Sequence, residues 1–182
     1  MMAIKQVEET HSPYLLFDLF SFSNGFMKRK NKILIGLLIV LVAAQAIQPS
    51  KNQGNPTGPK DIFSVLQVPT NVQQILKRSC YDCHSNQTTY PWYDNITPVN
   101  WWVAHHINEG KRELNFTEFG NYTVKRQSKK LDEVAETVES DEMPLNSYLI
   151  MHGDAKLSID EKKLLIDWAK AAMNQVKQVP AP

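Results

Sequence analysis

The sequence has few cysteines and almost no excess of charge of either sign. Its two cysteines, Cys80 and Cys83, are three positions apart, so no disulfide framework joins distant parts of the chain. The 20 lysines and arginines nearly balance the 19 aspartates and glutamates, and residues 33–182 hold 15 basic and 16 acidic side chains. Nucleic-acid binding needs a clustered basic face, so we expect no nucleic-acid partner.

Long apolar runs are also absent, except near the N-terminus. Residues 28–32 read KRKNK, residues 33–44 are twelve uninterrupted apolar residues with Gly36 included, and Ala44 to Ala46 form an Ala-x-Ala site. This order is typical of a secretory signal peptide. As a helix, residues 33–47 would reach about 22 Å, which is short of the roughly 30 Å hydrocarbon core of a bilayer.

Residues 33–47 are therefore either a signal peptide that is cleaved or a membrane anchor that is retained. The polar run from Gln48 onward favours retention, and the flanking charges disfavour a buried core helix. The basic excess predicts that residues 1–32 are a cytoplasmic extension and that the rest lies on the periplasmic side of the inner membrane, or is exported. Because this extension is unusually long, we expect that Met27 is the real start.

The whole sequence has the composition of an ordinary folded protein, with 42% apolar and 21% charged residues. Residues 48–60 are polar and rich in proline and glycine, which indicates a linker. We expect a single folded domain at residues 61–177, about 120 residues long, followed by a short tail at 178–182.

Four segments carry apolar residues at helical spacing, and none alternates convincingly as a strand would. The sequence therefore predicts an all-α fold. The first helix is expected to follow residues 69–71 and to run straight into Cys80. The second is expected to have Thr97 as its N-cap, Pro98 as its first residue and Gly110 as its terminator.

The other two helices lie in the C-terminal half. Apolar residues at 131, 134, 135 and 138 predict a third helix, which ends before Met143. Ser158 and Glu161 form a capping box ahead of the longest apolar stripe, which contains Trp168. We expect Trp102 and Trp168 to line either a pocket or the core.

Residues 80–84 read Cys-Tyr-Asp-Cys-His, which is the C-x-x-C-H signature of covalent c-type haem attachment. Two thiols on one turn can reach the two vinyl groups on one edge of a porphyrin, while His84 projects its imidazole toward the iron. A redox-active dithiol and a zinc site are the alternatives. The first would need a βαβ context, and the second would need another pair of ligands at short spacing.

The sixth ligand of the iron has several candidates. Met143 lies 59 residues after His84, precedes Pro144 and falls outside the apolar stripes. We rank it first, because thioether plus imidazole is the usual pair in electron-transfer haems. Its alternative role is that of a loop methionine filling a gap in the packing.

Two histidines are rivals to this methionine. His106 falls at the centre of the apolar face of the second expected helix, whereas His105 points away from it. A lone histidine on an apolar face, such as His106, is more often a satisfied core residue or a hydrogen-bond partner, here of a haem propionate, than an iron ligand. His152, which precedes Gly153, is most simply a cation at a helix end. An open sixth position is the remaining possibility.

A family resemblance is carried by short runs at residues 80–86, 90–93, 101–103, 106–107, 109–110, 114–116, 142–144, 152–155 and 157–158. In these runs the chain resembles a bacterial family of haem-binding domains with a single C-x-x-C-H, typically carried on a short N-terminal membrane segment. Two positions depart from it: His105 doubles a histidine, and Phe119 stands where tryptophan is expected. The resemblance implies haem c on Cys80 and Cys83 with its iron on His84. The layout also looks like small soluble cytochromes c.

The sequence thus predicts a monohaem c domain, periplasmic or membrane-tethered through residues 33–47, that passes single electrons between redox partner proteins. The second hypothesis is a haem-based peroxidase or a gas or redox sensor, with an open or histidine-ligated sixth position. The third is a haem-free interaction module with a local disulfide.

Overall fold

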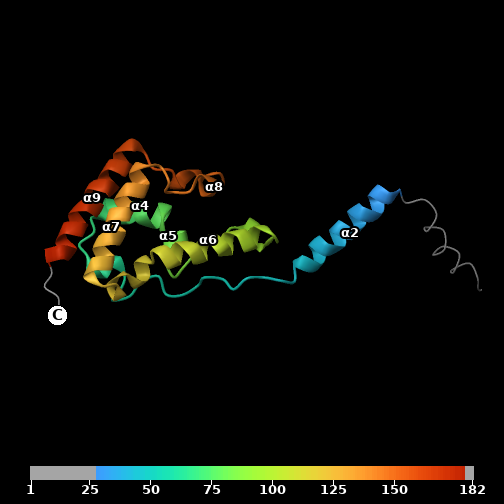
Figure 1. The fold of residues 1–182 in the computed structure, drawn as a ribbon, viewed down its shortest axis with the longest axis horizontal. Helices are drawn as coiled ribbons and strands as arrows, with labels where there is room; N and C mark the ends of the chain where they lie inside the picture. Colours follow the sequence, from blue (N-terminus) through green and yellow to red (C-terminus); the bar gives the residue numbers. More distant parts are fainter. Residues whose placement is uncertain (1–27, 179–182) are drawn as a thin grey trace, which may run out of the picture. The chain divides into compact units, whose positions relative to one another are not determined.

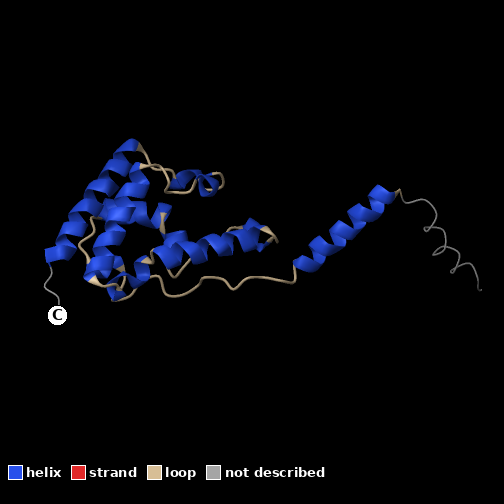
Figure 2. Cartoon of the chain, viewed as in Figure 1, coloured by secondary structure: helices blue, strands red, loops and turns tan. Residues whose placement is uncertain are grey.

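The computed structural model describes residues 28–178, and within that range it contains helices and loops but no strand (Figure 2). This confirms the predicted all-α class. The chain divides after Ala46 into two compact units, which we describe separately. The expected start at Met27, most of the extension 1–32 and most of the tail 178–182 lie outside the described residues.

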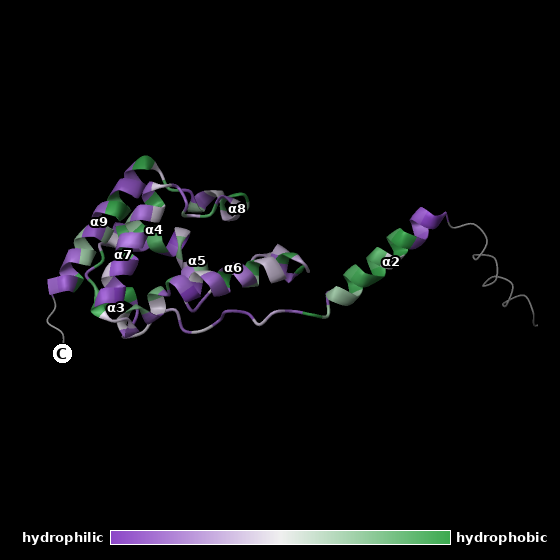
Figure 3. Ribbon diagram, in the orientation of Figure 1, coloured by the Kyte–Doolittle hydropathy of each residue, from purple (hydrophilic) through white to green (hydrophobic). Residues whose placement is uncertain are grey.

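The N-terminal unit contains one helix, α2 (Arg29–Ala44). Its 16 residues include most of the predicted apolar segment, none of them is buried, and Figure 3 shows the helix coloured mainly as hydrophobic. None of the helices within residues 28–178 combines the length and the apolar character needed to cross a membrane.

The second unit begins at Ile47 and contains the predicted domain (Figure 1). Its elements, in chain order, are α3 (Ile62–Val65), α4 (Thr70–Ser79), α5 (Tyr81–His84), η1 (Trp92–Asn95), α6 (Val99–Glu113), η2 (Phe116–Asn121), α7 (Val124–Glu139), α8 (Asn146–Leu149), η3 (Gly153–Ala155) and α9 (Ile159–Gln178).

Helices α7 and α9 form the most extensive helix pair of this unit, and they lie side by side in Figure 1. Leu131 and Leu165 are fully buried between the elements of this core, and Trp168 is buried with them. The predicted capping box is present, because the Glu161 N–H donates to Ser158 Oγ and the Ser158 N–H donates to the Glu161 carboxylate. Both C-terminal helices are therefore confirmed, and Trp168 is a core residue.

Helix α4 leads directly into the cysteine motif. It buries Val72, Ile75 and Leu76, and it ends at Ser79 with Cys80 as its C-cap. Helix α5 then starts at Tyr81. The prediction of a helix that runs straight into the motif is confirmed.

The predicted limits of the next helix were wrong at both ends. Helix α6 begins at Val99 with Pro98 as its N-cap, while Thr97 lies outside it and is buried. The helix passes through Gly110 and continues to Glu113. Gly110 is present for a different reason: a β-carbon there would lie 2.8 Å from the carbonyl oxygen of Cys83. The glycine therefore allows close approach of α6 to α5 and does not terminate the helix.

The expected linker 48–60 contains no helix, and part of it lies against the domain. The side-chain amide of Asn52 donates to the Ser85 carbonyl oxygen and to Thr88 Oγ1, both at 2.9 Å. The Gly54 N–H donates to the Asn86 carbonyl oxygen at 2.7 Å. These contacts attach the chain preceding the domain to the residues that follow the cysteine motif.

Candidate functional site

Helix α5 is held from its inner side by a row of three aromatic rings. Tyr81 is stacked between Phe63 and Phe116, with ring centroids 5.1 and 5.3 Å apart and nearly parallel planes. The Tyr81 hydroxyl donates to the carboxylate of Asp61 at 3.2 Å. Tyr81 is buried in this row, and the neighbouring Cys80, Cys83 and His84 are half-buried.

The imidazole of His84 is oriented by a backbone carbonyl. Its Nδ1 lies 2.9 Å from the carbonyl oxygen of Leu114, which can only accept, so Nδ1 carries the proton. In the neutral ring Nε2 is then left with a lone pair. Burial lowers the pKa of His84, although the backbone contacts at Leu114 and Gly110 act in the opposite direction. A neutral imidazole fixed through Nδ1 is the usual form of a metal-binding histidine.

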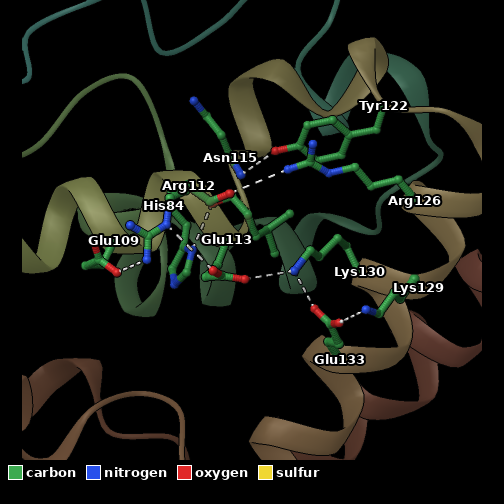
Figure 4. Close-up of polar contacts among 11 residues, drawn as sticks. His84, Glu109, Arg112, Glu113, Asn115, Tyr122, Arg126, Lys129, Lys130 and Glu133 are labelled. Atoms are coloured by element: carbon green, nitrogen blue, oxygen red, sulfur yellow. Dashed lines mark hydrogen bonds and ion pairs between the residues drawn. The ribbon is translucent and has the colours of Figure 1, made fainter.

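Ion pairs between α6 and α7 border this histidine, as Figure 4 shows. Lys130 Nζ lies 2.6 Å from the carboxylate of Glu133 on its own helix and 3.3 Å from that of Glu113 on α6. The Lys130 side chain is only 12% exposed, so this bridge is partly shielded from solvent. It ties the end of α6, and with it the Leu114 carbonyl, to α7.

The two cysteines are free thiols. Burial raises the pKa of Cys80 to about 12 and that of Cys83 to about 11. Both are therefore protonated at neutral pH, whereas a reactive dithiol of the thioredoxin type needs a lowered pKa. In the part of the chain that the structure describes, no three or more His, Cys, Asp and Glu side chains gather so that they could hold a metal ion. The geometry thus favours neither the dithiol nor the zinc alternative.

Three adjoining cavities surround the motif. Cavity A, of about 290 Å³, lies beside Cys83. Cavity B, of about 170 Å³, is lined by both cysteines and His84, and cavity C, of about 260 Å³, is lined by Cys80 and His84. Neighbouring cavities share lining residues, and together they reach the size of typical ligand pockets. Two thiols and a neutral imidazole around one apolar space are the donor set that a covalently attached haem requires.

Met143 shares these cavities with the motif. It lines both cavity B and cavity C, together with Cys80 and His84. The fold therefore brings the methionine and the histidine, 59 residues apart in sequence, to the walls of the same space.

His106 also lines cavity B, and it lines cavity A with the apolar face of α6. Its Nδ1 lies 2.9 Å from the Trp102 carbonyl oxygen, and its ring centroid lies 4.1 Å from that of Trp102. Trp102 itself is 46% exposed and lines cavity A. This face of α6 therefore borders a cavity and is not a core face, apart from the buried Ile107.

His152 lies in a different environment. Both its ring nitrogens are engaged: Nε2 lies 3.1 Å from the Tyr93 hydroxyl and Nδ1 lies 3.1 Å from the Tyr148 carbonyl oxygen. The ring is stacked on that of Tyr148, with centroids 4.0 Å apart. It lines cavity A but not the two cavities that His84 lines. The structure thus separates it from His84 and from Met143.

Sequence reasoning missed a second anchor of the motif. The Tyr148 hydroxyl donates to one carboxylate oxygen of Asp82 at 2.9 Å, and the Thr89 N–H donates to the other at 3.0 Å. Asp82 thereby links α5 to α8 and to the chain after the motif. The sequence offered no signal for these partners, whereas Gly110, in the middle of an apolar helical pattern, could have indicated a close contact.

The comparisons with known proteins agree with this site. A family model described as a haem-binding domain matches residues 39–171, which include the motif, Met143 and all three cavities. No curated protein and no solved structure matches the chain. Because the family model covers most of the sequence, the chain belongs to the family of haem-binding domains.

Proposed function

We propose that this protein holds one haem c covalently through Cys80 and Cys83, with His84 as an iron ligand, and that it transfers single electrons between redox partner proteins. The observation that carries the proposal is the arrangement around cavity B, where both thiols and the oriented imidazole of His84 line one space. The haem-binding family supports the cofactor itself. The proposed location is the periplasmic side of the inner membrane, with residues 33–47 as an anchor or an export signal.

When bound, haem supplies reversible one-electron chemistry. The protein's residues would hold it and set its environment. The Leu114 carbonyl keeps the His84 ring in one orientation and one tautomer, which strengthens Nε2 as a ligand. The walls of cavities B and C are mostly apolar, apart from charged residues such as Glu113, and would limit the access of water to that side of the haem.

We assign the sixth position to Met143. Met143 lines the two cavities that His84 lines, and a neutral sulfur ligand in addition to imidazole would favour electron transfer over chemistry on bound oxygen species. His106 is the remaining rival, because it borders cavity B.

The first experiment tests covalent attachment. The full chain is produced in a host with cytochrome c maturation, and its intact mass and pyridine haemochrome spectrum are measured. We expect a mass gain of one haem and a haem stain that survives denaturing electrophoresis. Cys80→Ser and Cys83→Ser should each lose one thioether bond, whereas Ser64→Ala, an exposed position on α3, should behave as wild type. An unchanged mass with two free thiols would contradict the proposal.

The second experiment identifies the sixth ligand. We expect a low-spin ferric spectrum with a sulfur-to-iron charge-transfer band that disappears in Met143→Ala. Met151→Ala is the matched control, because Met151 is exposed and lines only cavity A. High-spin iron that binds CO rapidly and turns over peroxide would favour a peroxidase or sensor instead.

A further inference from the structure

One end of the domain carries almost no charge. Residues 85–108 and 143–153 contain no lysine or arginine, and their single carboxylate belongs to Asp94, which is 4% exposed. Desolvation raises the pKa of Asp94, so its charge is further disfavoured there. By contrast, α7 alone carries four basic and four acidic residues.

These two segments, which contain only the one carboxylate of Asp94, meet in space. The Tyr93 hydroxyl of η1 and the Nε2 of His152, just after α8, lie 3.1 Å apart. In Figure 1, α8 and the N-terminal half of α6 extend on the same side of this unit, away from α7 and α9. The uncharged residues therefore form one continuous end of the domain.

Large apolar side chains project from this end into solvent. Trp92 is 73% exposed, Ile96 45%, Trp101 41% and Ile150 80%. We call these four residues the apolar rim. None of them lines cavity A, B or C, so a haem in those cavities would leave the rim uncovered. An exposed apolar cluster of this kind marks an interaction surface.

The chain that follows the apolar N-terminal segment is fixed to this same end. The indole N–H of Trp101 donates to the carbonyl oxygen of Ile47, the last residue of segment 33–47, at 2.8 Å. The side chain of Asn100 donates to that of Gln48 at 2.6 Å. Lys51 donates to the side-chain oxygen of Asn95. The domain thus receives its tether at the rim.

We propose that the apolar rim sits in the interfacial layer of a phospholipid bilayer. The proposal rests on the membrane tether of the proposed function. Ile47, the last residue of that tether, accepts a hydrogen bond from Trp101 of the rim. Tryptophan is enriched at membrane interfaces, and apolar side chains contribute affinity there in proportion to the area they bury. Within residues 85–108 and 143–153 no exposed carboxylate would be repelled by lipid phosphates, although the exposed Asp154 directly follows the second of these segments.

This orientation has a consequence for the haem site. Trp102 and Met151, the sequence neighbours of Trp101 and Ile150, line cavity A beside Cys83. The Cys83 side of the site therefore faces the lipid surface, and the charged helices α7 and α9 face away from it.

The test uses the full chain in vesicles of phosphatidylcholine and phosphatidylglycerol that include a lipid with a photoreactive diazirine near its glycerol backbone. After illumination, lipid adducts are mapped by peptide mass spectrometry. We expect adducts on residues 33–47, on 92–101 and at Ile150, severalfold above those at Ile159. Ile159 is a matched reference, because it is 86% exposed and lies on α9.

A second measurement compares variants. Trp92→Ser combined with Ile150→Ser should reduce labelling around Trp101 severalfold, and Ile159→Ser should not change it. Adducts on residues 33–47 without adducts on the rim would overturn the inference and leave the tether intact. Absence of adducts from residues 33–47 and from the rim would contradict the membrane tether of the proposed function. Equal labelling of the rim and of α7 would overturn the inference about the rim.

Discussion

Gly110 and Cys83 lie so close together that no side chain fits between them. A β-carbon on Gly110 would lie 2.8 Å from the carbonyl oxygen and 3.2 Å from the β-carbon of Cys83. The first of these atoms belongs to the backbone, which cannot move aside as the end of a flexible side chain can. Helix α6 therefore packs directly on the turn that carries the cysteine motif.

Gly110→Ala is expected to destabilise the protein despite the better helix propensity of alanine. The propensity gain is about 1 kcal/mol, whereas inserting an atom into a tight backbone contact costs about 1–3 kcal/mol. We expect a net loss of up to about 2 kcal/mol in the free energy of unfolding, with less haem incorporated. Urea denaturation followed by circular dichroism checks this. Gly58→Ala, with no atom within 4 Å of the new β-carbon, should be nearly neutral.

Ser158→Ala should weaken the start of α9. The Ser158 hydroxyl accepts from the Glu161 N–H at 3.2 Å, and loss of such a cap costs about 1 kcal/mol. Thermal unfolding should show a lower melting temperature for this variant. Ser64→Ala is the control, because Ser64 is exposed and lies inside α3, whose N-cap is Asp61. An equal effect of both changes would contradict the capping role.

Asp61 is expected to make stability fall as pH rises. Desolvation raises the pKa of this buried carboxyl, although the Phe63 N–H and the Tyr81 hydroxyl favour its charged form. The folded state therefore keeps the proton to a higher pH than the unfolded chain, whose carboxyl titrates near a pKa of about 4. Above that pH the unfolded state binds fewer protons than the folded state does. The free energy of unfolding therefore decreases as the pH rises, until the folded-state pKa is passed.

Asp61→Asn should remove this part of the pH dependence, since the amide oxygen can still accept from the Phe63 N–H. Urea unfolding at a series of pH values between mildly acidic and neutral measures it. Asp132→Asn, at an exposed position of α7, is the control. If the free energy of unfolding of Asp61→Asn depended on pH as steeply as that of the wild type, the burial of this carboxyl would not be the cause of the pH dependence.

His152→Ala should leave the visible spectrum of the ferric protein unchanged, because both ring nitrogens are already engaged with Tyr93 and Tyr148. The variant should instead lose roughly 1–2 kcal/mol of stability from these hydrogen bonds. Spectra and urea unfolding are measured on the same sample. A spectral change like that expected for Met143→Ala would place His152 at the iron.

Helices α4, α7 and α9 were predictable, because each buries one stripe of apolar residues at helical spacing. The stripe that contains Leu131 predicted α7, and the capping box at Ser158 and Glu161 predicted the start of α9. Helix α6 was predicted less well. Its apolar face lines a cavity. Local sequence rules attribute its glycine, Gly110, to a helix end, whereas in the structure this glycine allows a close contact with Cys83.

The amino-acid sequence by itself determined the cysteine motif and its histidine, because their chemistry depends on residues that are chain neighbours on a single turn. Only the tertiary structure decided which distant side chains share their space, and it places His106 as well as Met143 at cavity B. Met143 reaches the walls that His84 lines, whereas His152 is held by Tyr93 and Tyr148. Side-chain proximity over dozens of residues depends on how helices pack, and a local pattern contains no information about that packing.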